Sequence, residues 1–331
     1  MIIGRREFLG RTAGALAGLG ANRLLGSPIS SLAQEAKSAC PDVAVAAGTD
    51  ADSPAALLKT ALDGLGGLER FVRPGHVVAV KPNATWAYPP GTASSTDPEL
   101  LRALILMLRD AGARRVIVMD HCTLDPGTEA CLRVNGIGSL LEKLSVETIF
   151  PDRGLSPKEV YRTITLPQGR AFTRLGVIRA ALAADVRINM AVAKTHLVTR
   201  LTMCLKNMMG FLEAPAGLHA DLDRGIADIN TPSPIQAQLH ILEAIRVRLP
   251  VGRKQAGGNE TELTHPEKIK RLNEIVVGTD PVLVDSYGAV NYFTFKLREL
   301  PFITRAFDAG LGQMDAALAA REGRLRTFAL G

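Results

Sequence analysis

The sequence contains few aromatic residues and no long hydrophobic run outside its N-terminal region. Phenylalanine, tyrosine and tryptophan make up 5% of the 331 residues. The net charge is +6, but four arginines and one glutamate within residues 1–33 supply +3 of it. Because nucleic-acid surfaces combine clustered basic residues with aromatic side chains, no nucleic-acid partner is expected. Later segments fall short of the roughly 20 apolar residues of a membrane helix, so no stable membrane insertion is expected either.

Cysteine is also scarce. Cys40, Cys122, Cys131 and Cys204 match no zinc or ferredoxin spacing. In an oxidising compartment Cys122 and Cys131, the closest pair in sequence, could form a disulfide, and unpaired thiols fit the spacing equally well. The nucleotide P-loop, the G-x-G-x-x-G fingerprint and the signature of a Ser–His–Asp triad are absent, which argues against those enzyme classes.

The N-terminus has the features of an export signal. Residues 4–10 read Gly-Arg-Arg-Glu-Phe-Leu-Gly, a mildly apolar stretch follows over residues 12–25, and residues 31–33 offer small side chains for a signal peptidase. We expect residues 1–33 to be a twin-arginine signal peptide, read by the twin-arginine translocase. The chain would then fold before export and reach a periplasmic or other extracytoplasmic compartment. A chance arginine pair and an uncleaved anchor are the alternatives, and Arg23 interrupts the apolar stretch.

Residues 34–331 have the pattern of a single α/β domain. Continuous apolar runs indicate strands buried on both faces, and amphipathic segments between them indicate helices. Strands are expected at residues 43–47, 77–80, 116–119, 186–193 and 275–277, and helices at 53–65, 98–111, 172–184, 199–209 and 235–246. This alternation predicts a mostly parallel sheet flanked by helices, with room for a smaller inserted subdomain.

Polar side chains directly follow several of these strands. In open parallel sheets ligands bind beyond the carboxyl ends of the strands, so these side chains are expected to share one pocket. One polar residue after a strand carries little information, because loops are generally polar. Polar residues after four strands favour a shared site. The residues are Lys81, Asn83, Asp120, His121, Lys194, His196 and Asp280, and Lys206 and Asn207 follow within an apolar helix. Lys206 either joins this pocket or extends its ammonium to solvent.

Three interpretations of the pocket remain open. In the first, the chain is an enzyme that acts on an anionic small molecule. His196, Lys194 and Lys206 are then the catalytic residues, and His196 transfers a proton. The residues that bind the ligand are Lys81, Asn83, Asn207 and Asp280. In the second, it is a metal-binding or metallocofactor redox protein. Its ligands would include His121, Asp120 and His196, with Asp280, Cys122 and Cys204 as further candidates. In the third, it is a non-catalytic periplasmic binding protein. The residues single out no particular cofactor.

Several segments resemble the family catalogued as domain of unknown function 362. They are residues 71–83, the Lys-Thr-His of 194–196, the Lys-Asn-x-x-Gly of 206–210, residues 278–285 and residues 309–312. The similarity spans about residues 43–315. It implies a family without a settled activity, some members of which carry ferredoxin-type cysteine motifs. This chain lacks those motifs, so an iron–sulfur cluster bound by its own ligands is not expected. It also departs from the family near residues 249–262, where an Asp-Gly-containing strand and loop are usual.

Overall fold

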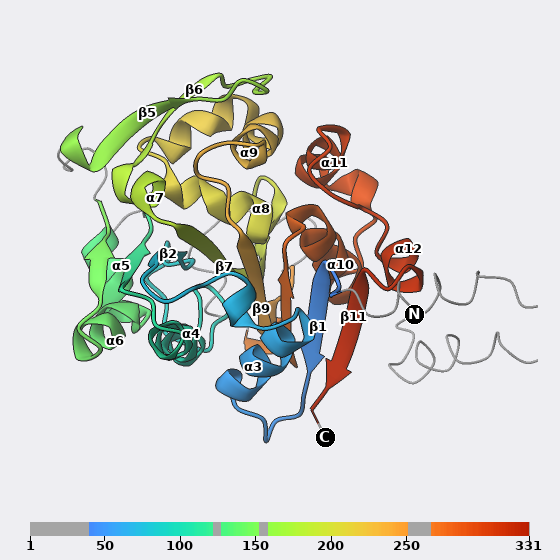
Figure 1. The fold of residues 1–331 in the computed structure, drawn as a ribbon. Helices are drawn as coiled ribbons and strands as arrows, with labels where there is room; N and C mark the ends of the chain where they lie inside the picture. Colours follow the sequence, from blue (N-terminus) through green and yellow to red (C-terminus); the bar gives the residue numbers. More distant parts are fainter. Residues whose placement is uncertain (1–39, 122–126, 152–157, 251–265, 331) are drawn as a thin grey trace, which may run out of the picture. The chain divides into compact units, whose positions relative to one another are not determined.

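The structure is a computed structural model that describes residues 40–121, 127–151, 158–250 and 266–330. At its centre lies a nine-stranded sheet with the order β11-β1-β10-β9-β7-β2-β3-β4, in which β8 pairs with β7 (Figure 1). Its strands are β1 (Val43–Ala47), β2 (Val77–Lys81), β3 (Arg115–Met119), β4 (Glu147–Ile149), β7 (Val186–His196), β8 (Arg200–Thr202), β9 (Leu239–Arg248), β10 (Ile269–Gly278) and β11 (Leu325–Ala329). All neighbours pair in parallel except at β10 and β8. The predicted α/β fold with a mostly parallel sheet is confirmed.

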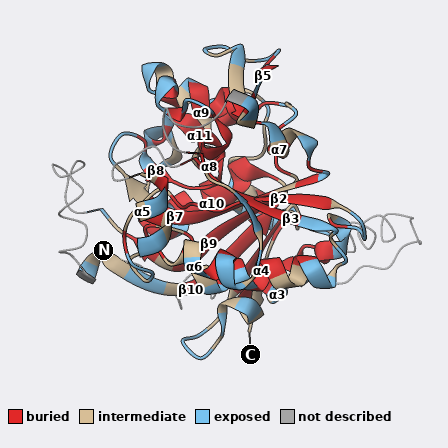
Figure 2. Cartoon of the chain, turned by 90° about the vertical axis from the view of Figure 1, so that its left-hand side faces the viewer, coloured by how far each residue is buried: buried red, intermediate tan, exposed pale blue. Residues whose placement is uncertain are grey.

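Helices cover both faces of this sheet and enclose one hydrophobic core on each. Figure 2 shows buried residues in the central strands and on the helix surfaces that face them. One core includes α3 (Pro54–Gly64), α4 (Pro98–Asp110), α5 (Thr128–Val134) and α6 (Ile137–Lys143). The other includes α7 (Arg179–Ala183), α8 (Cys204–Asn207), α9 (Leu222–Asn230), α10 (Pro281–Phe293), α11 (Pro301–Asp308) and α12 (Ala316–Arg321). From Cys40 onward the chain forms one compact unit.

The helices begin where the sequence provides caps. The Ser53 side chain accepts a hydrogen bond from the N–H of Ala56 at the start of α3, and Asp97 accepts one from Glu99 at the start of α4. Both helices also have proline in the first turn, where a missing N–H costs nothing. In the part of the chain that the structure describes, no helix combines the length and the apolar character needed to cross a membrane.

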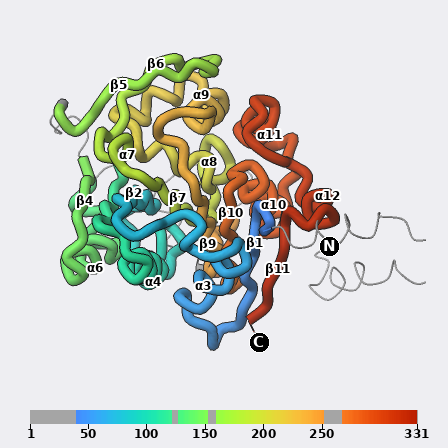
Figure 3. The backbone as a smooth tube through the Cα atoms, in the orientation of Figure 1, coloured from blue at the N-terminus to red at the C-terminus, as the bar shows by residue number. Residues whose placement is uncertain are grey.

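A small two-stranded sheet stands apart from the central one. It consists of β5 (Tyr161–Thr165) and β6 (Arg174–Ile178), which pair antiparallel. In Figure 3 this hairpin lies over α7 and α9. The Asp228 carboxylate of α9 accepts hydrogen bonds from the backbone N–H groups of residues 170–172, which fixes the connecting turn. The hairpin belongs to the same compact unit as the central sheet, so a separate inserted subdomain stays a prediction.

Three predicted helices are wrong in whole or in part. The predicted helix at 235–246 overlaps the central strand β9, in which nine of ten residues are buried. Because β9 is covered on both faces of the sheet, its apolar residues do not alternate with polar ones and resemble a helical pattern. Residues 172–184 form β6 followed by the short α7, and residues 199–209 form β8, α8 and a 3₁₀ turn. Strand β11, which completes one edge of the sheet, was not predicted.

Candidate functional site

A buried ion pair lies beyond the carboxyl ends of β2 and β3. Lys81 Nζ is 2.9 Å from Asp120 Oδ1, and both side chains are almost fully buried. Asp120 Oδ1 also accepts a hydrogen bond from the N–H of His121, and Oδ2 accepts one from Ala84. These bonds compensate the carboxylate for its lost hydration. Gly210 is required here, because a Cβ at that position would overlap both members of the ion pair.

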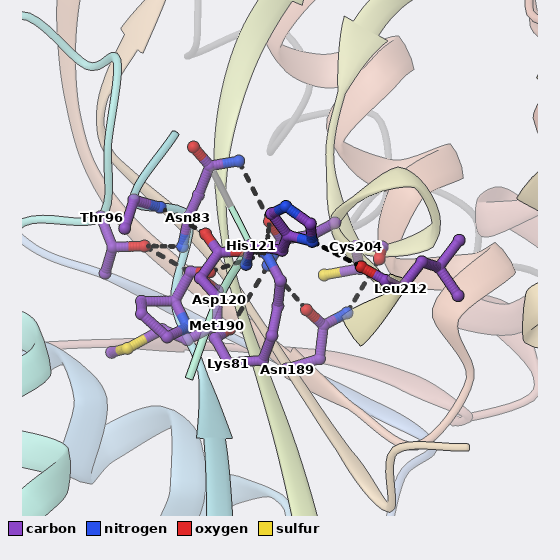
Figure 4. Close-up of polar contacts among 12 residues, drawn as sticks. Lys81, Asn83, Thr96, Asp120, His121, Asn189, Met190, Cys204 and Leu212 are labelled. Atoms are coloured by element: carbon purple, nitrogen blue, oxygen red, sulfur yellow. Dashed lines mark hydrogen bonds and ion pairs between the residues drawn. The ribbon is translucent and has the colours of Figure 1, made fainter. Parts of the chain in front are cut away.

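Asn207 connects this ion pair to the neighbouring strands. Its Oδ1 accepts hydrogen bonds from Lys81 Nζ at 2.8 Å and from Asn83 Nδ2 at 3.0 Å, and its Nδ2 donates to Asn189 Oδ1 at 2.8 Å. Figure 4 shows Lys81, Asn83 and Asn189 converging from β2, the loop after it and β7. Asn189 in turn donates to the Cys204 carbonyl at 2.8 Å. Because a buried amide needs partners at both ends, this arrangement fixes α8 against β2 and β7.

Lys194 lies at the end of β7 and is 4% exposed. Its ammonium donates hydrogen bonds to Asn83 Oδ1 at 2.9 Å and to the Ser94 carbonyl, and it lies 5.7 Å from the centre of the Trp86 ring. The structure therefore brings Lys194 into the same network as Lys81, Asn83 and Asn207. Its ammonium holds the loop of residues 82–97 in place.

Arg248 at the end of β9 holds the same loop from the next strand. Its guanidinium donates hydrogen bonds to the Thr92 carbonyl and to Ser94 Oγ, and it lies 5.7 Å from the centre of the Tyr88 ring. The Tyr88 ring stacks on that of Trp86 at a centroid distance of 5.7 Å. Two cations from adjacent strands thus pack against one aromatic pair.

His196 follows Lys194 and is held in one tautomer. Its Nδ1 accepts hydrogen bonds from the backbone N–H groups of Val198 at 3.1 Å and Thr199 at 3.2 Å. Since those groups only donate, the proton of the neutral ring lies on Nε2. Burial, followed by the positive charges of Lys206 and Lys194, lowers the pKa of His196 to about 2. At pH 7 the ring is a neutral hydrogen-bond donor.

Lys206 is the one predicted lysine whose ammonium has no hydrogen bond or ion pair within the described residues. Its side chain is half-buried. Burial, followed by the positive charge of Lys81, lowers the pKa of Lys206 to about 8. The positive charge of Lys206 in turn contributes to the lowered pKa values of His196 and His219. An ammonium in such surroundings lacks a counter-charge.

The two predicted metal ligands His121 and Asp120 differ, because His121 has a nitrogen lone pair without a partner among the described residues and Asp120 has no unengaged oxygen. His121 Nδ1 donates to the Leu212 carbonyl at 2.8 Å, and the buried Nε2 has no hydrogen-bond partner among the described residues. Both Asp120 oxygens are already engaged. Within the described residues, no group of three or more His, Cys, Asp and Glu side chains is arranged to hold a metal ion. Cys122 lies outside those residues.

Asp280 is not part of this cluster. Strand β10 runs antiparallel to β9, so Asp280 lies toward the edge of the sheet where β7 and β9 begin. Its carboxylate accepts hydrogen bonds from Leu283 at 2.8 Å, at the start of α10, and from Gln313 at 2.7 Å. The expectation that Asp280 lies at the same end of the sheet as the other site residues assumed that every strand was parallel, and β10 is antiparallel to β9.

Some contributors to the site were not predicted as site residues. Asn189 and His240 lie within apolar strands, and a polar residue in such a run is the signal that could have identified them. Asn189 Nδ2 lies 3.1 Å from His240 Nδ1. His219 lies in a short 3₁₀ segment without a recognisable pattern.

The remaining predictions about the surroundings of the site have mixed outcomes. The Cys131 thiol donates a hydrogen bond to the Thr85 carbonyl. Because Cys122 is not described, the pairing of Cys122 with Cys131 stays a prediction.

A surface pocket of about 250 Å³ between β6 and residues 212–218 has Leu212 in its lining, but none of the predicted site residues. That the predicted site residues line one common concavity therefore stays a prediction.

Comparison with known proteins places these residues in a family. The family model described as Domain of unknown function (DUF362) matches residues 78–290. The chain is 29% identical over 203 residues to the thylakoid-associated protein sll1697 of Synechocystis sp. (strain ATCC 27184 / PCC 6803 / Kazusa). That match covers 59% of this chain and 60% of the relative's length.

Among solved structures, the lactate racemase apoprotein from Thermoanaerobacterium thermosaccharolyticum is similar at a TM-score of 0.39 and 13% identity. The similarity covers 71% of this chain and 54% of the racemase chain. The family match extends over more than half of the present sequence, from β2 to α10, and includes Lys81, Lys194 and Lys206. The chain therefore belongs to the DUF362 family.

Proposed function

We propose that this chain is an enzyme that binds an anionic small molecule between Lys206 and His196. The observation that carries the proposal is the half-buried Lys206, whose ammonium has no partner in the described residues and whose charge acts on the neutral His196 imidazole. A carboxylate, phosphate or sulfate oxygen would accept hydrogen bonds from Lys206 Nζ and His196 Nε2. Charge-assisted hydrogen bonds of this kind are among the strongest that proteins make.

The other lysines support this site without competing for the ligand. The Lys81 charge is balanced by Asp120, and the Lys194 ammonium is bonded to Asn83 and Ser94. The Lys194 charge still contributes to the local potential that attracts an anion, and with burial and the Lys206 charge it keeps His196 neutral. We therefore assign direct ligand contact to Lys206 and His196, and a supporting role to Lys81, Lys194, Asn83 and Asn207.

Proton transfer falls to Lys206 in this proposal, although the sequence pointed to His196. The His196 lone pair on Nδ1 is occupied by two backbone N–H groups, and Nε2 already carries a proton. Lys206, with a pKa of about 8, is mostly charged near physiological pH but loses its proton more readily than an ordinary lysine, so a minor fraction is neutral. In this neutral form Lys206 can accept a proton from a bound substrate while His196 donates a hydrogen bond to the substrate's oxygen, and the resulting ammonium then binds the anionic product of that proton transfer.

We also propose that the enzyme works outside the cytoplasm, after export through the twin-arginine translocase. The support is the motif of residues 4–10 with its apolar stretch and the small residues at 31–33. These positions lie outside the described residues.

A thermal-shift titration tests the anion proposal. Sulfate, phosphate and malonate should raise the melting temperature of the wild-type protein, because a ligand selective for the native state stabilises it. Lys206→Met should abolish most of this response. Lys59→Met is the matched control: it removes one lysine charge from the exposed surface of α3, and its response should equal that of wild type. Equal anion responses in wild type and Lys206→Met would rule out the proposed site.

A further inference from the structure

Lys206 lies on a helix that cannot hold its own position. Helix α8 comprises the four residues Cys204–Asn207, about one turn. A helix this short is unstable in isolation, because nucleation costs more than its few hydrogen bonds return. Its orientation must therefore come from groups outside it.

One of these groups is a buried carboxylate on the adjacent helix α10. Asp285 is fully buried, and its Oδ1 accepts a hydrogen bond from the N–H of Cys204 at 2.8 Å. Its Oδ2 accepts a second from the N–H of Leu205 at 2.9 Å. The two oxygens thus bind two successive amides in the first turn of α8, directly before Lys206. Burial raises the pKa of Asp285 to about 7, although the two backbone bonds and a hydrogen bond with the Cys204 side chain favour the carboxylate form.

Two buried amides secure the same peptides from other directions. Asn230 of α9 donates from Nδ2 to the Leu205 carbonyl at 2.9 Å, and Asn189 of β7 donates to the Cys204 carbonyl at 2.8 Å. The peptide groups before Lys206 therefore have partners on three different elements. The residue after it, Asn207, is fixed by Lys81 and Asn83.

We infer that Asp285 is a positioning residue for Lys206, holding its ammonium in the anion site through the backbone of Cys204 and Leu205. The inference rests on the proposed anion site and extends it to a residue that touches no ligand. This role differs from that of an ordinary buried polar group, because removing the Asp285 carboxylate should change the pKa and the anion affinity of Lys206 in protein that is still folded.

Asp285→Asn tests this inference, because the amide retains one acceptor oxygen and puts a donor where the other stood. Lysines are reductively methylated with a ¹³C label, and the Lys206 signal is assigned by its absence in Lys206→Arg. In wild type this signal should titrate near pH 8, and in Asp285→Asn it should move toward the ordinary lysine value of 10.5. Sulfate affinity, measured calorimetrically, should fall about tenfold, the size expected for loss of one hydrogen bond to a charged group.

Ser286→Ala provides the matched control. Ser286 is the next residue on α10, is equally buried, and its hydroxyl has no hydrogen-bond partner among the described residues. This variant should retain both the wild-type Lys206 titration and the wild-type sulfate affinity. If Asp285→Asn does not fold, Asn230→Ala releases the Leu205 carbonyl and should produce the same two shifts.

The two proposals fail in different ways. A folded Asp285→Asn protein with an unchanged Lys206 titration overturns the positioning role. Sulfate binding that survives Lys206→Met overturns the anion site, while the titration of Lys206 still reports whether Asp285 positions it.

Discussion

The surroundings of the Lys206 ammonium affect both anion binding and the free energy of unfolding. Its pKa is lowered to about 8 in the folded protein, against an ordinary value of 10.5 that applies to the unfolded chain. Below about pH 8 the folded protein carries a charge in surroundings that disfavour it, so without a ligand Lys206 destabilises the fold. Between about pH 8 and 10.5 the unfolded chain binds the extra proton, and this destabilisation fades as the pH rises.

Lys206→Met should therefore be more stable than wild type at pH 6–7 in anion-free buffer. The difference should shrink as the pH increases from 8 to 10.5, because the wild-type amine then becomes neutral when folded. Urea unfolding of both proteins at several pH values measures this, and Lys59→Met again serves as the charge-matched control. A difference that is independent of pH would show that packing, not the Lys206 charge, controls the stability of this position.

Single residues also show what sequence can and cannot reveal about the site. Lys81, Asn83, Lys194 and Asn207 were identified by their positions after strands or by the family motif, and the structure joins them in one network. The tautomer of His196 could not be predicted, because it depends on the turn that follows β7. The engagement of Asp120 by Ala84 and Lys81 likewise depends on the three-dimensional path of a loop.

At the scale of elements, the loop of residues 82–97 depends on cations supplied by β7 and β9. Arg248→Met should release the side of this loop that contains Tyr88, because it removes the hydrogen bonds to Thr92 and Ser94. Trp86 is the single tryptophan of the chain, so its fluorescence reports on this loop alone. The emission should shift to longer wavelength as the ring gains contact with water.

Arg271→Met is a suitable comparison, since Arg271 lies on the neighbouring strand β10 and pairs with Asp50, outside this loop. Its emission should stay at the wild-type wavelength. An unchanged spectrum in Arg248→Met would show that Arg248 does not hold the loop.

Elements also account for the errors in the predicted secondary structure. Strand β9 is buried on both faces, so its sequence lacks the alternation that marks a strand, and its apolar residues recur at intervals close to those of a helix. Helix α8 is too short to leave a periodic signal. Where a run combined apolar residues with flanking turn signals, as in β2 and β3, the strands were predicted within a residue or two of their bounds.

At the scale of the whole molecule, the direction of one strand separated Asp280 from the site. A mostly parallel sheet was predictable from the alternation of strands and helices, but the antiparallel course of β10 was not. It depends on long-range pairing with β1 and β9, for which a single sequence gives no local signal. Strand β11, near the C-terminus, pairs with β1, near the N-terminus, and a single sequence gives no local signal for that pairing either.

Export also concerns the molecule as a whole. Replacing both Arg5 and Arg6 with lysine should block translocation, because the translocase reads paired guanidinium groups and lysine lacks their planar donor geometry. A reporter fused to the chain would then remain in the cytoplasm, whereas Arg11→Lys, outside the pair, should leave export intact. A reporter that still reaches the periplasm after the double change contradicts the export proposal.

The most direct test of the anion site is a crystal structure with selenate, whose anomalous signal locates the anion without reference to the surrounding density. At pH 7 Lys206 is mostly charged and His196 carries its proton on Nε2, so we predict a selenium peak between Lys206 Nζ and His196 Nε2, with selenate oxygens accepting hydrogen bonds from both. The peak should be absent from Lys206→Met crystals grown and soaked in the same way. Ordered Lys206 and His196 side chains with no selenate between them, at concentrations that saturate the thermal shift, would contradict the proposed site.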